Sequence, residues 1–252
     1  MEVSTEQCYV CGNYSTFSIA PGATLLREAI CSHCTASIRY SDMARVISES
    51  LVLESLPLVE AADRLGEFAI LESQSDGPIH DVLEGLPGYV CFEYLDGVRP
   101  GDFANGILCN DFQSLTFADE TFDLVISQDV FEHIADPYKA FREIRRVLKA
   151  GGVHVFTVPL HEGRSSKSRN GLPAVFHGDP LRAQGALVYT DWGDDTAAIA
   201  DSFGMLTTRY DLHVFHAAHE ITDADLTYAE YLGTDPISYF KYNSIVFASM
   251  KL

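Results

Sequence analysis

The chain has 252 residues, 47% of them hydrophobic and 11% aromatic, which is enough for one sizeable core plus a small appendage and excludes a mainly disordered chain. Its 17 lysines and arginines against 36 aspartates and glutamates give a formal net charge of -19, which would repel a phosphate backbone. No signal-peptide pattern opens the chain, and no segment approaches the roughly 20 apolar residues of a membrane helix. We therefore expect a cytoplasmic protein that binds neither nucleic acid nor a membrane.

The first feature along the chain is two Cys-x2-Cys pairs with 19 residues between them, formed by Cys8, Cys11, Cys31 and Cys34. Two close thiol pairs on short turns can present four sulfurs tetrahedrally to one ion. We predict a structural zinc ribbon over residues 1–40, because four cysteines leave no open position for a substrate. A disulfide pair, a redox Cys-x-x-Cys motif and an iron site with four sulfurs are the alternatives. Cys91 and Cys109 stand alone in apolar runs and are typical of small buried residues.

Apolar residues at helical spacings predict one or two connecting helices over residues 41–65, interrupted at Pro57. Short apolar runs then alternate with helix or turn material, which favours a mainly parallel sheet covered on both faces. The runs predicted as strands are Phe68–Leu71, Tyr89–Phe92, Phe122–Ser127, Val153–Val158, Leu206–Phe215 and Ser244–Ser249.

The clearest helix begins at Asp136, a capping residue, with Pro137 in its first turn, and ends before Gly151 and Gly152. The segment of residues 160–200 is different, because it is rich in glycine, proline, serine and charge and has no sustained period. It predicts a long insertion over the carboxyl edge of the sheet, of the kind that covers a site.

The stretch from Asn110 to Pro159 closely resembles class I S-adenosylmethionine-dependent methyltransferases of the type-11 group. The motifs that carry the resemblance are Leu-x-Phe-x-Asp, Phe-Asp-Leu-Val, Glu-His-Ile, Arg-Val-Leu-Lys, Gly-Gly and a strand ending in Val-Pro. The resemblance implies a doubly wound, Rossmann-like α/β domain over residues 66–252, with a mostly parallel sheet of seven strands.

The resemblance also implies a set of cofactor-binding residues. Asp111 would contact the adenine amino group with the Phe112 amide beside it, and Glu93 would accept the two ribose hydroxyls. Tyr94 follows Glu93 in a Glu-Tyr pair that is similar to one in a bacterial group of methyltransferase-like proteins. The remaining positions are Gln128 near the transferred methyl, and Glu72 and Gly77 around the loop after the first strand.

That loop departs from the family pattern. Such enzymes place an acid and several glycines there, since a side chain would block the approach of the backbone to the cofactor. This chain reads Glu72-Ser73-Gln74-Ser75-Asp76 before Gly77.

The predicted function is S-adenosylmethionine-dependent methyl transfer to an oxygen or nitrogen of a small molecule. Candidates for the base or for positioning the substrate are His177 and Asp179 in the insertion, then Asp129 and His133. The alternative is a methyltransferase-like domain that is not catalytic and acts as a binding or scaffold partner, or that uses a different nucleoside cofactor. The sequence leaves a homodimer open.

Overall fold

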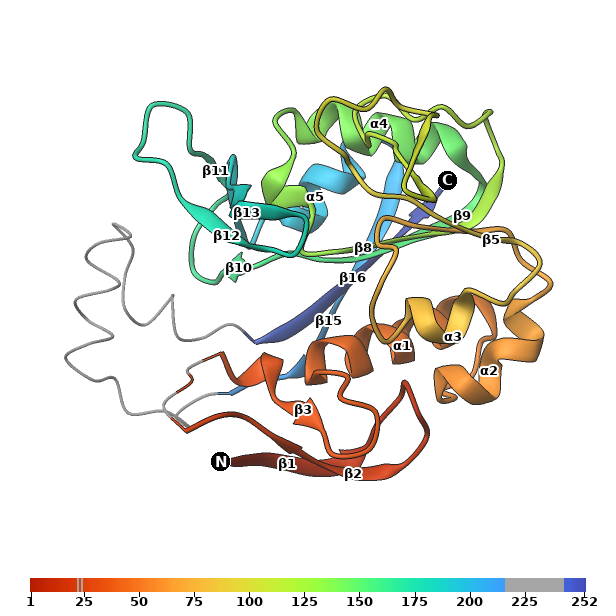
Figure 1. Cartoon of the computed structure of the whole chain (residues 1–252), viewed down its shortest axis with the longest axis vertical. Coiled ribbons are helices and arrows are strands. Elements are labelled where there is room, and N and C mark those ends of the chain that lie inside the picture. Colours follow the sequence, from red (N-terminus) through yellow and green to blue (C-terminus); the bar gives the residue numbers. More distant parts are fainter. Residues whose placement is uncertain (22, 24, 216–242) are drawn as a thin grey trace.

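A computed structural model describes residues 1–252 except 22, 24 and 216–242. Its centre is a mixed sheet of six strands in the order β15-β16-β9-β8-β4-β5 (Figure 1). The strands are β4 (Ile70–Glu72), β5 (Tyr89–Cys91), β8 (Phe122–Gln128), β9 (Leu148–Thr157), β15 (Met205–His213) and β16 (Ser244–Lys251). The pairs β5-β4, β4-β8 and β8-β9 are parallel, whereas β16 runs antiparallel to β9 and β15. Each predicted strand run falls on one of these six strands.

The predicted count of seven strands is not confirmed. Beyond β5 the described chain adds one parallel bridge, between Glu93 and Cys109, instead of a full strand. The residues before this bridge form a separate hairpin of β6 (Phe103–Ala104) and β7 (Ile107–Leu108). The described chain therefore has no continuous strand at the place of the expected seventh one.

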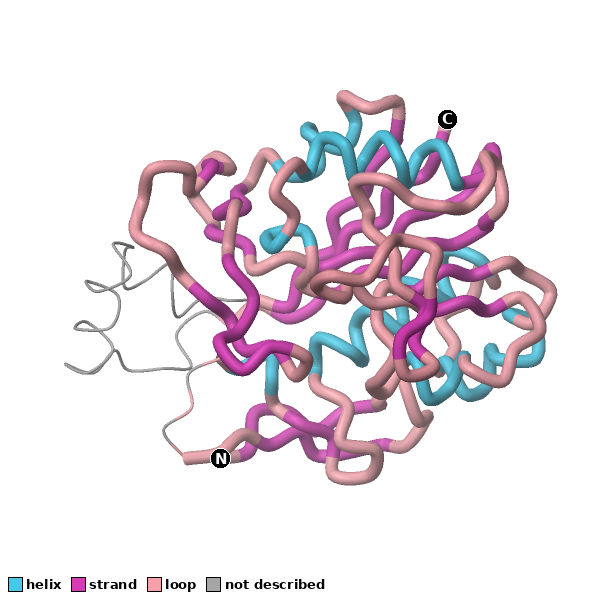
Figure 2. Tube along the Cα trace, turned by 45° about the horizontal axis from the view of Figure 1, so that its top comes forward, coloured by secondary structure: helices cyan, strands magenta, loops and turns pink. Residues whose placement is uncertain are grey.

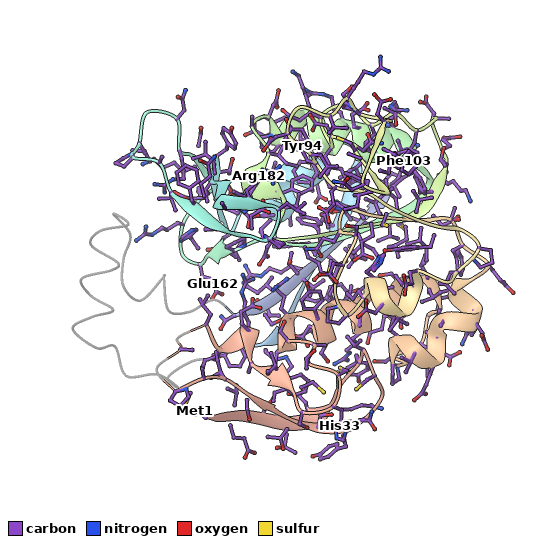
Figure 3. The ribbon with its side chains drawn as sticks, in the orientation of Figure 1. Met1, His33, Tyr94, Phe103, Glu162 and Arg182 are labelled. Atoms are coloured by element: carbon purple, nitrogen blue, oxygen red, sulfur yellow. The ribbon has the colours of Figure 1, made fainter. Side chains whose placement is uncertain are left out.

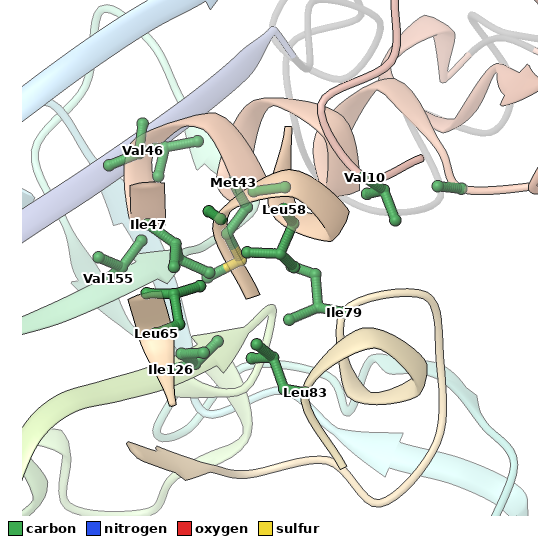
Figure 4. Close-up of a cluster of buried hydrophobic side chains, with 14 of the residues drawn as sticks. Val10, Met43, Val46, Ile47, Leu58, Leu65, Ile79, Leu83, Ile126 and Val155 are labelled. Carbon is green, nitrogen blue, oxygen red and sulfur yellow. The ribbon is translucent and has the colours of Figure 1, made fainter. Parts of the chain in front are cut away.

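Helices cover both faces of the sheet. In Figure 1, α1 (Ile38–Leu51), α2 (Leu58–Leu65) and α3 (His80–Leu83) lie below it, and α4 (Pro137–Val147) and α5 (Thr196–Asp201) lie above it. Figure 4 shows Met43 and Ile47 of α1 packed among Leu65, Ile126 and Val155. Val125, the neighbour of Ile126 on β8, belongs to the second buried cluster, on the α4 side. The sheet is therefore buried on both faces, as the doubly wound prediction requires.

The predicted capping of α4 is confirmed. The Asp136 side chain accepts a hydrogen bond from the Lys139 amide at 3.2 Å, and Pro137 occupies the first turn. The helix ends at Val147, four residues before the glycines that the sequence suggested as its stop. Gly151, with φ of +76°, instead lies inside β9, at an irregularity in the pairing with β8.

The cysteine module, residues 1–40, is a three-stranded antiparallel sheet of β1 (Glu2–Gln7), β2 (Tyr14–Ser18) and β3 (Ile30–Cys31), with a 3-10 turn, η1 (Leu26–Glu28). Its apolar residues, such as Val10 and Phe17, belong to the same buried cluster as α1 and β8. His213 of β15 lies between Glu6 of β1 and Asp42 of α1, at 2.9 and 2.8 Å. The module is therefore packed onto the central domain.

Burial of His213 alone would lower its pKa, but the hydrogen bonds and charges of Asp42 and Glu6 raise that pKa to about 10. The imidazole is thus a cation at neutral pH. It joins the module, the first helix and the sheet through two charge-assisted hydrogen bonds.

The insertion of residues 160–200 contains five short strands, which its sequence did not predict. They are β10 (Leu160–His161), β11 (Lys167–Ser168), β12 (Phe176–Asp179), β13 (Arg182–Leu187) and β14 (Thr190–Gly193). The pair β12-β13 forms an antiparallel hairpin, here called the cover hairpin, which Figure 2 shows as the magenta pair beside the central strands. Strands of two to six residues are too short to display a hydrophobic period. Among the described residues, no helix has the length and apolar character needed to span a bilayer.

Candidate functional site

Two adjoining cavities open where the parallel strands end. The first, the strand-edge cavity, has a volume of about 610 Å³ and is lined by residues that follow β4, β5 and β8 and by the cover hairpin. The second, the arginine cavity, has a volume of about 530 Å³ and lies between η1, α1 and the insertion. Residues that line both are Gln74, Gln128, Asp129, His133, Phe176 and Gly178. Ligands of doubly wound sheets bind at this edge, so both cavities are candidates for binding.

The structure brings five of the predicted cofactor residues together on the wall of the strand-edge cavity: Glu93, Tyr94, Asp111, Phe112 and Gln128. Asp111 Oδ1 accepts a hydrogen bond from the Gln113 amide at 2.8 Å, which fixes the carboxylate on a tight turn. The Phe112 ring is buried against Phe92, with ring centroids 5.1 Å apart. The Asp111 carboxylate and the aromatic ring of Phe112 are thus held next to each other at the cavity.

One carboxylate oxygen of Glu93 already accepts hydrogen bonds from within the protein. Its Oε1 accepts hydrogen bonds from the Ser75 amide at 2.8 Å and from the Ser75 hydroxyl at 3.0 Å. Burial raises the pKa of Glu93, although the Ser75 bonds oppose that rise. A ligand hydroxyl would therefore meet a carboxylate with one oxygen occupied by the loop that replaces the glycines.

Two glutamines at the boundary of the cavities, the half-buried Gln74 and the buried Gln128, each have a buried polar atom without a hydrogen-bond partner among the described residues. Within the described part of the chain, neither Gln74 Oε1 nor Gln128 Nε2 has a hydrogen-bond partner. The other amide atom of Gln128, Oε1, accepts from Arg39 at 3.3 Å. Because a buried polar group without a partner is costly, this acceptor and this donor mark places where a polar ligand can bind.

Two other predicted cofactor residues, Glu72 and Gly77, line neither cavity. Glu72 is buried and accepts a hydrogen bond from the Tyr89 hydroxyl at 2.6 Å, and burial raises its pKa to about 8. Gly77 has φ of +114°, and a Cβ there would lie 3.2 Å from the Tyr40 hydroxyl. Both residues therefore act in the packing of the loop, and Ser73 and Gln74 take the places that face the cavity.

Asp129, a predicted base, is held by two arginines. Arg27 Nη2 donates to its Oδ2 at 2.6 Å, Arg39 Nε lies 3.5 Å from the same oxygen, and the Thr157 hydroxyl donates to its Oδ1 at 2.9 Å. Burial alone would raise the pKa of Asp129, but the two guanidinium groups and the Thr157 bond lower it to about 2. The carboxylate is therefore a poor base, and it holds the side chains of Arg27 and Arg39 in place.

The two arginines were assigned no role in the sequence analysis. Arg27 lies in η1 and Arg39 in the first turn of α1, so the cysteine module contributes directly to the wall of the arginine cavity. More than 100 residues separate Arg27 from Asp129, and no spacing rule connects them.

The arginine cavity is lined by five of the 17 cationic side chains of a strongly acidic protein: Arg27, Arg39, Arg164, Lys167 and Arg169. Arg169 forms a bidentate ion pair with Asp191, at 3.1 and 2.9 Å. Three of these cations fall within residues 164–169, a basic run that could have been noticed in the sequence. Asp129, Glu132 and Asp191 also line the cavity, so its cations outnumber its carboxylates by two, and this excess of positive charge favours an anionic ligand.

The insertion brings the remaining predicted residues, His177 and Asp179, to the cavities. Asp179 accepts an ion-paired hydrogen bond from Arg182, whose guanidinium also donates to the Tyr94 carbonyl at 2.8 Å and lies over the Tyr94 ring. Arg182 thus links the cover hairpin to the segment after β5, where Figure 3 labels Tyr94, and Asp179 holds Arg182 in place. The rings of His177 and His133 meet edge to face, with centroids 5.1 Å apart.

The four cysteines of the module converge on one point. Their sulfurs lie within 4.8 Å of one another, with Cys8 to Cys34 at 3.7 Å and Cys11 to Cys31 at 4.0 Å. These separations are too long for a disulfide bond of about 2.05 Å. They fit the edges of about 3.8 Å in a tetrahedron of sulfurs that each lie about 2.3 Å from a zinc ion. The donor set therefore suits zinc.

Comparison with known proteins finds similarity to methyltransferases. Residues 95–156, about a quarter of the chain, match the family model described as a methyltransferase domain. The match includes Asp111, Phe112, Gln128, Asp129 and His133. It therefore covers one wall of the strand-edge cavity.

Among curated proteins, the chain is 45% identical over 49 residues to a sarcosine/dimethylglycine N-methyltransferase of Halorhodospira halochloris, covering 19% of this chain and 18% of that protein. It is 38% identical over 60 residues to a glycine/sarcosine/dimethylglycine N-methyltransferase of Actinopolyspora halophila, covering 24% of this chain and 11% of that protein. The matches thus span less than a fifth of the length of these relatives.

Among solved structures, an S-adenosylmethionine-dependent methyltransferase from Mesorhizobium loti matches with a TM-score of 0.43 and 14% identity, over 74% of this chain and 92% of that chain. One from Methanosarcina mazei matches with a TM-score of 0.40 and 12% identity, over 73% and 92%.

Proposed function

We propose that the chain is an S-adenosylmethionine-dependent methyltransferase that acts on a nitrogen or oxygen of a small anionic molecule. The observation that carries the proposal is the strand-edge cavity, where Glu93 and Asp111 present carboxylates beside the buried ring of Phe112. The resemblance to type-11 methyltransferases assigns these positions to the ribose and the adenine. The match of residues 95–156 to a methyltransferase domain supports it.

Methyl transfer breaks the bond between sulfur and the methyl carbon and forms a bond from that carbon to the acceptor atom, leaving S-adenosylhomocysteine. The protein must align the acceptor in line with the leaving sulfur and, for a hydroxyl or a protonated amine, take up one proton. Gln74 and Gln128, at the boundary of the two cavities, offer an acceptor and a donor to polar groups of cofactor or substrate.

The ion pairs of the site bear on which side chain could take up the proton of the methyl acceptor. Arg27 and Arg39 hold the pKa of Asp129 at about 2, so this carboxylate cannot take up a proton at neutral pH, and Asp179 is engaged in an ion pair with Arg182. The imidazoles of His133 and His177 lie next to each other at the arginine cavity. We propose that they face the acceptor.

The arginine cavity suggests the class of substrate. Five cationic side chains around it suit a carboxylate or a similar anionic group, which would place the acceptor atom toward the shared boundary. The curated relatives are named for the N-methylation of glycine, sarcosine and dimethylglycine, which are small amines with a carboxylate. Methylation of a small amino acid or related amine is therefore the more specific form of the proposal.

One observation favours the second candidate, a domain that binds another nucleoside or serves as a scaffold. Ser75 occupies one oxygen of Glu93, the carboxylate that would otherwise present both oxygens to a ribose. A cofactor would have to share this carboxylate with the loop or displace Ser75.

Calorimetric titration of the metal-replete protein with S-adenosylmethionine and with S-adenosylhomocysteine separates the two candidates. A methyltransferase binds both ligands with one site per chain, and release of S-adenosylhomocysteine then requires an added amine or hydroxyl acceptor. Failure to bind either ligand would reject methyl transfer and leave the scaffold or another nucleoside.

A further inference from the structure

A second cluster of metal-ligating side chains lies away from the cysteines, at the wall of the arginine cavity. Glu132 and His133 belong to a 3-10 turn, η2 (Phe131–His133), after β8, and His177 lies on β12 of the cover hairpin. One ligand atom of each lies within 4.8 Å of the others. Glu132 Oε1 is 3.5 Å from His133 Nε2 and 3.6 Å from His177 Nδ1.

Glu132 has no compensating hydrogen bond. The residue is 1% exposed, and neither of its carboxylate oxygens has a hydrogen-bond partner within the described residues. A buried carboxylate without a bonded partner is strongly unfavourable, so it calls for a cation at short range. The two imidazole nitrogens that face Glu132 Oε1 both lie beyond normal hydrogen-bond length.

The hydrogen bonding of His133 fixes which of its nitrogens is free. Its Nδ1 lies 2.9 Å from the Leu187 carbonyl, which can only accept, so Nδ1 carries a proton. In the neutral ring, Nε2 then presents a lone pair toward the Glu132 carboxylate. Two lone pairs that face each other across 3.5 Å repel, unless a proton or a metal ion lies between them.

The spacing favours a metal ion over a proton. Two nitrogen or oxygen ligands of a tetrahedral ion at about 2.1 Å lie roughly 3.4 Å apart, close to both distances from Glu132 Oε1. A carbonyl bonded to the second nitrogen of a ligating histidine is the usual support for such a ligand. The Tyr189 amide also donates to the Glu132 carbonyl at 2.7 Å, so the insertion holds the backbone of the cluster in place.

We propose that Glu132, His133 and His177 bind a divalent first-row transition-metal ion such as Zn²⁺. Two imidazoles and one carboxylate leave coordination positions open, as in catalytic sites of zinc and non-haem iron. All three residues line the arginine cavity, and His133 also lines the strand-edge cavity. The open positions therefore face the place where an acceptor would bind, and they suit an oxygen of the substrate.

The role of the metal ion in catalysis rests on the proposed methyl transfer. The existence of the metal site does not depend on that proposal. A bound metal lowers the pKa of a coordinated hydroxyl and holds a carboxylate in a fixed orientation. It would also join the cover hairpin to the end of β8 through His177, because η2 directly follows that strand.

The test is the metal content of the full-length protein, measured by elemental analysis after equilibration with Zn²⁺ and removal of loosely bound ion. We expect two ions per chain, one at the cysteines and one at the new site. Glu132→Gln and His177→Ala should each reduce the count to one, while the matched control His80→Gln, at a histidine bonded to Tyr89, keeps two. The ion retained at the cysteines shows that the module of the variant is formed, and its melting curve shows that the rest of the chain is folded.

A second measurement distinguishes the metal from a charged histidine. In the metal-free protein, Glu132→Gln removes an uncompensated carboxylate, so its melting temperature should equal or exceed that of the unsubstituted chain. A wild-type count that Glu132→Gln does not change, or a lower melting temperature of the metal-free Glu132→Gln protein, would overturn the proposal in favour of an imidazolium ion pair. Titration with S-adenosylmethionine is a separate readout, so failure of the methyltransferase proposal leaves the metal count unaffected.

Discussion

The cysteine module and the strand-edge cavity place polar groups in the protein in opposite ways. The module draws its four sulfurs from two tight turns within 27 residues, so each pair is formed by local backbone alone. The cavity draws Glu93, Asp111 and Gln128 from the ends of separate strands, and its cover from residues 176–187. The comparison teaches that local sites can be read from spacing, whereas sites at a sheet edge depend on the topology of the whole domain.

The two regions are nevertheless connected. Arg27 and Arg39, which belong to the module, form ion pairs with Asp129 at the end of β8. The module thus carries the cysteine cluster and also forms a wall of the site. The following changes test how far the two regions depend on each other.

The largest expected effect is that of Cys31→Ser. A serine hydroxyl is a poor replacement for a thiolate, and zinc binding is worth on the order of 10 kcal/mol to a small module that cannot bury a core alone. We expect the variant to lose one equivalent of zinc and to unfold at a much lower temperature. Cys91→Ser, at a cysteine outside the cluster, is the control and should retain the metal. A Cys31→Ser protein with unchanged zinc content and melting temperature would be incompatible with the zinc site.

Asp129→Asn tests the connection between the regions. Removal of one partner from a buried ion pair costs up to about 3–5 kcal/mol, and here Arg27 and Arg39 lose Asp129 but keep Glu28, which lies 3.3 and 2.8 Å from them. Urea denaturation at pH 7 measures this loss. Asp119→Asn, at an exposed carboxylate paired with Arg146, should change the free energy of unfolding by less than about 0.5 kcal/mol.

The pH dependence of this difference has a defined sign. The folded-state pKa of Asp129, about 2, is below its ordinary value of 3.8, so its stabilisation is complete above about pH 4 and is lost as the pH falls toward 2. The gap between wild type and Asp129→Asn should therefore narrow across this acid range. A gap that stays constant from pH 5 to pH 2.5 would show that the ion pair is not its source.

Asp111→Asn affects the cavity and leaves the module intact. A carboxylate accepts a stronger hydrogen bond from an adenine amino group than an amide oxygen does, and the lost difference of about 1–1.5 kcal/mol corresponds to a roughly 5- to 13-fold weaker affinity. Calorimetry with S-adenosylhomocysteine measures it. Asp102→Asn, at an exposed carboxylate paired with Arg99, is the matched control. Equal affinities for the two variants would remove Asp111 from the cofactor site.

Gly77→Ala should have the smallest effect on ligand binding. The positive φ of Gly77 makes any side chain unfavourable there, by about 1–2 kcal/mol of folding free energy, and its Cβ would press on Tyr40. Since Gly77 lines neither cavity, the affinity for S-adenosylhomocysteine should remain within about twofold. Gly85→Ala, at a site with open space and ordinary φ, serves as the control. A large loss of affinity without loss of stability would return Gly77 to the cofactor site.

These expectations reflect what the sequence could and could not provide. The strand runs and the capped helix at Asp136 were predictable because burial and local hydrogen bonding decide them. The contacts of Arg27 with Asp129 and of Glu132 with His177 were not predictable. Each depends on a partner that packing of the module or of the cover hairpin brings near. Glu72 shows the converse, since its motif position suggested a cofactor contact while the fold pairs it with Tyr89.

The most direct test of the central claim is a crystal structure of the protein with S-adenosylhomocysteine bound. The account predicts density for the ligand in the strand-edge cavity, with the adenine at Asp111 and Phe112 and the ribose hydroxyls at Glu93. Density for the ligand at another place, or a cavity without ligand at saturating concentration, would contradict it.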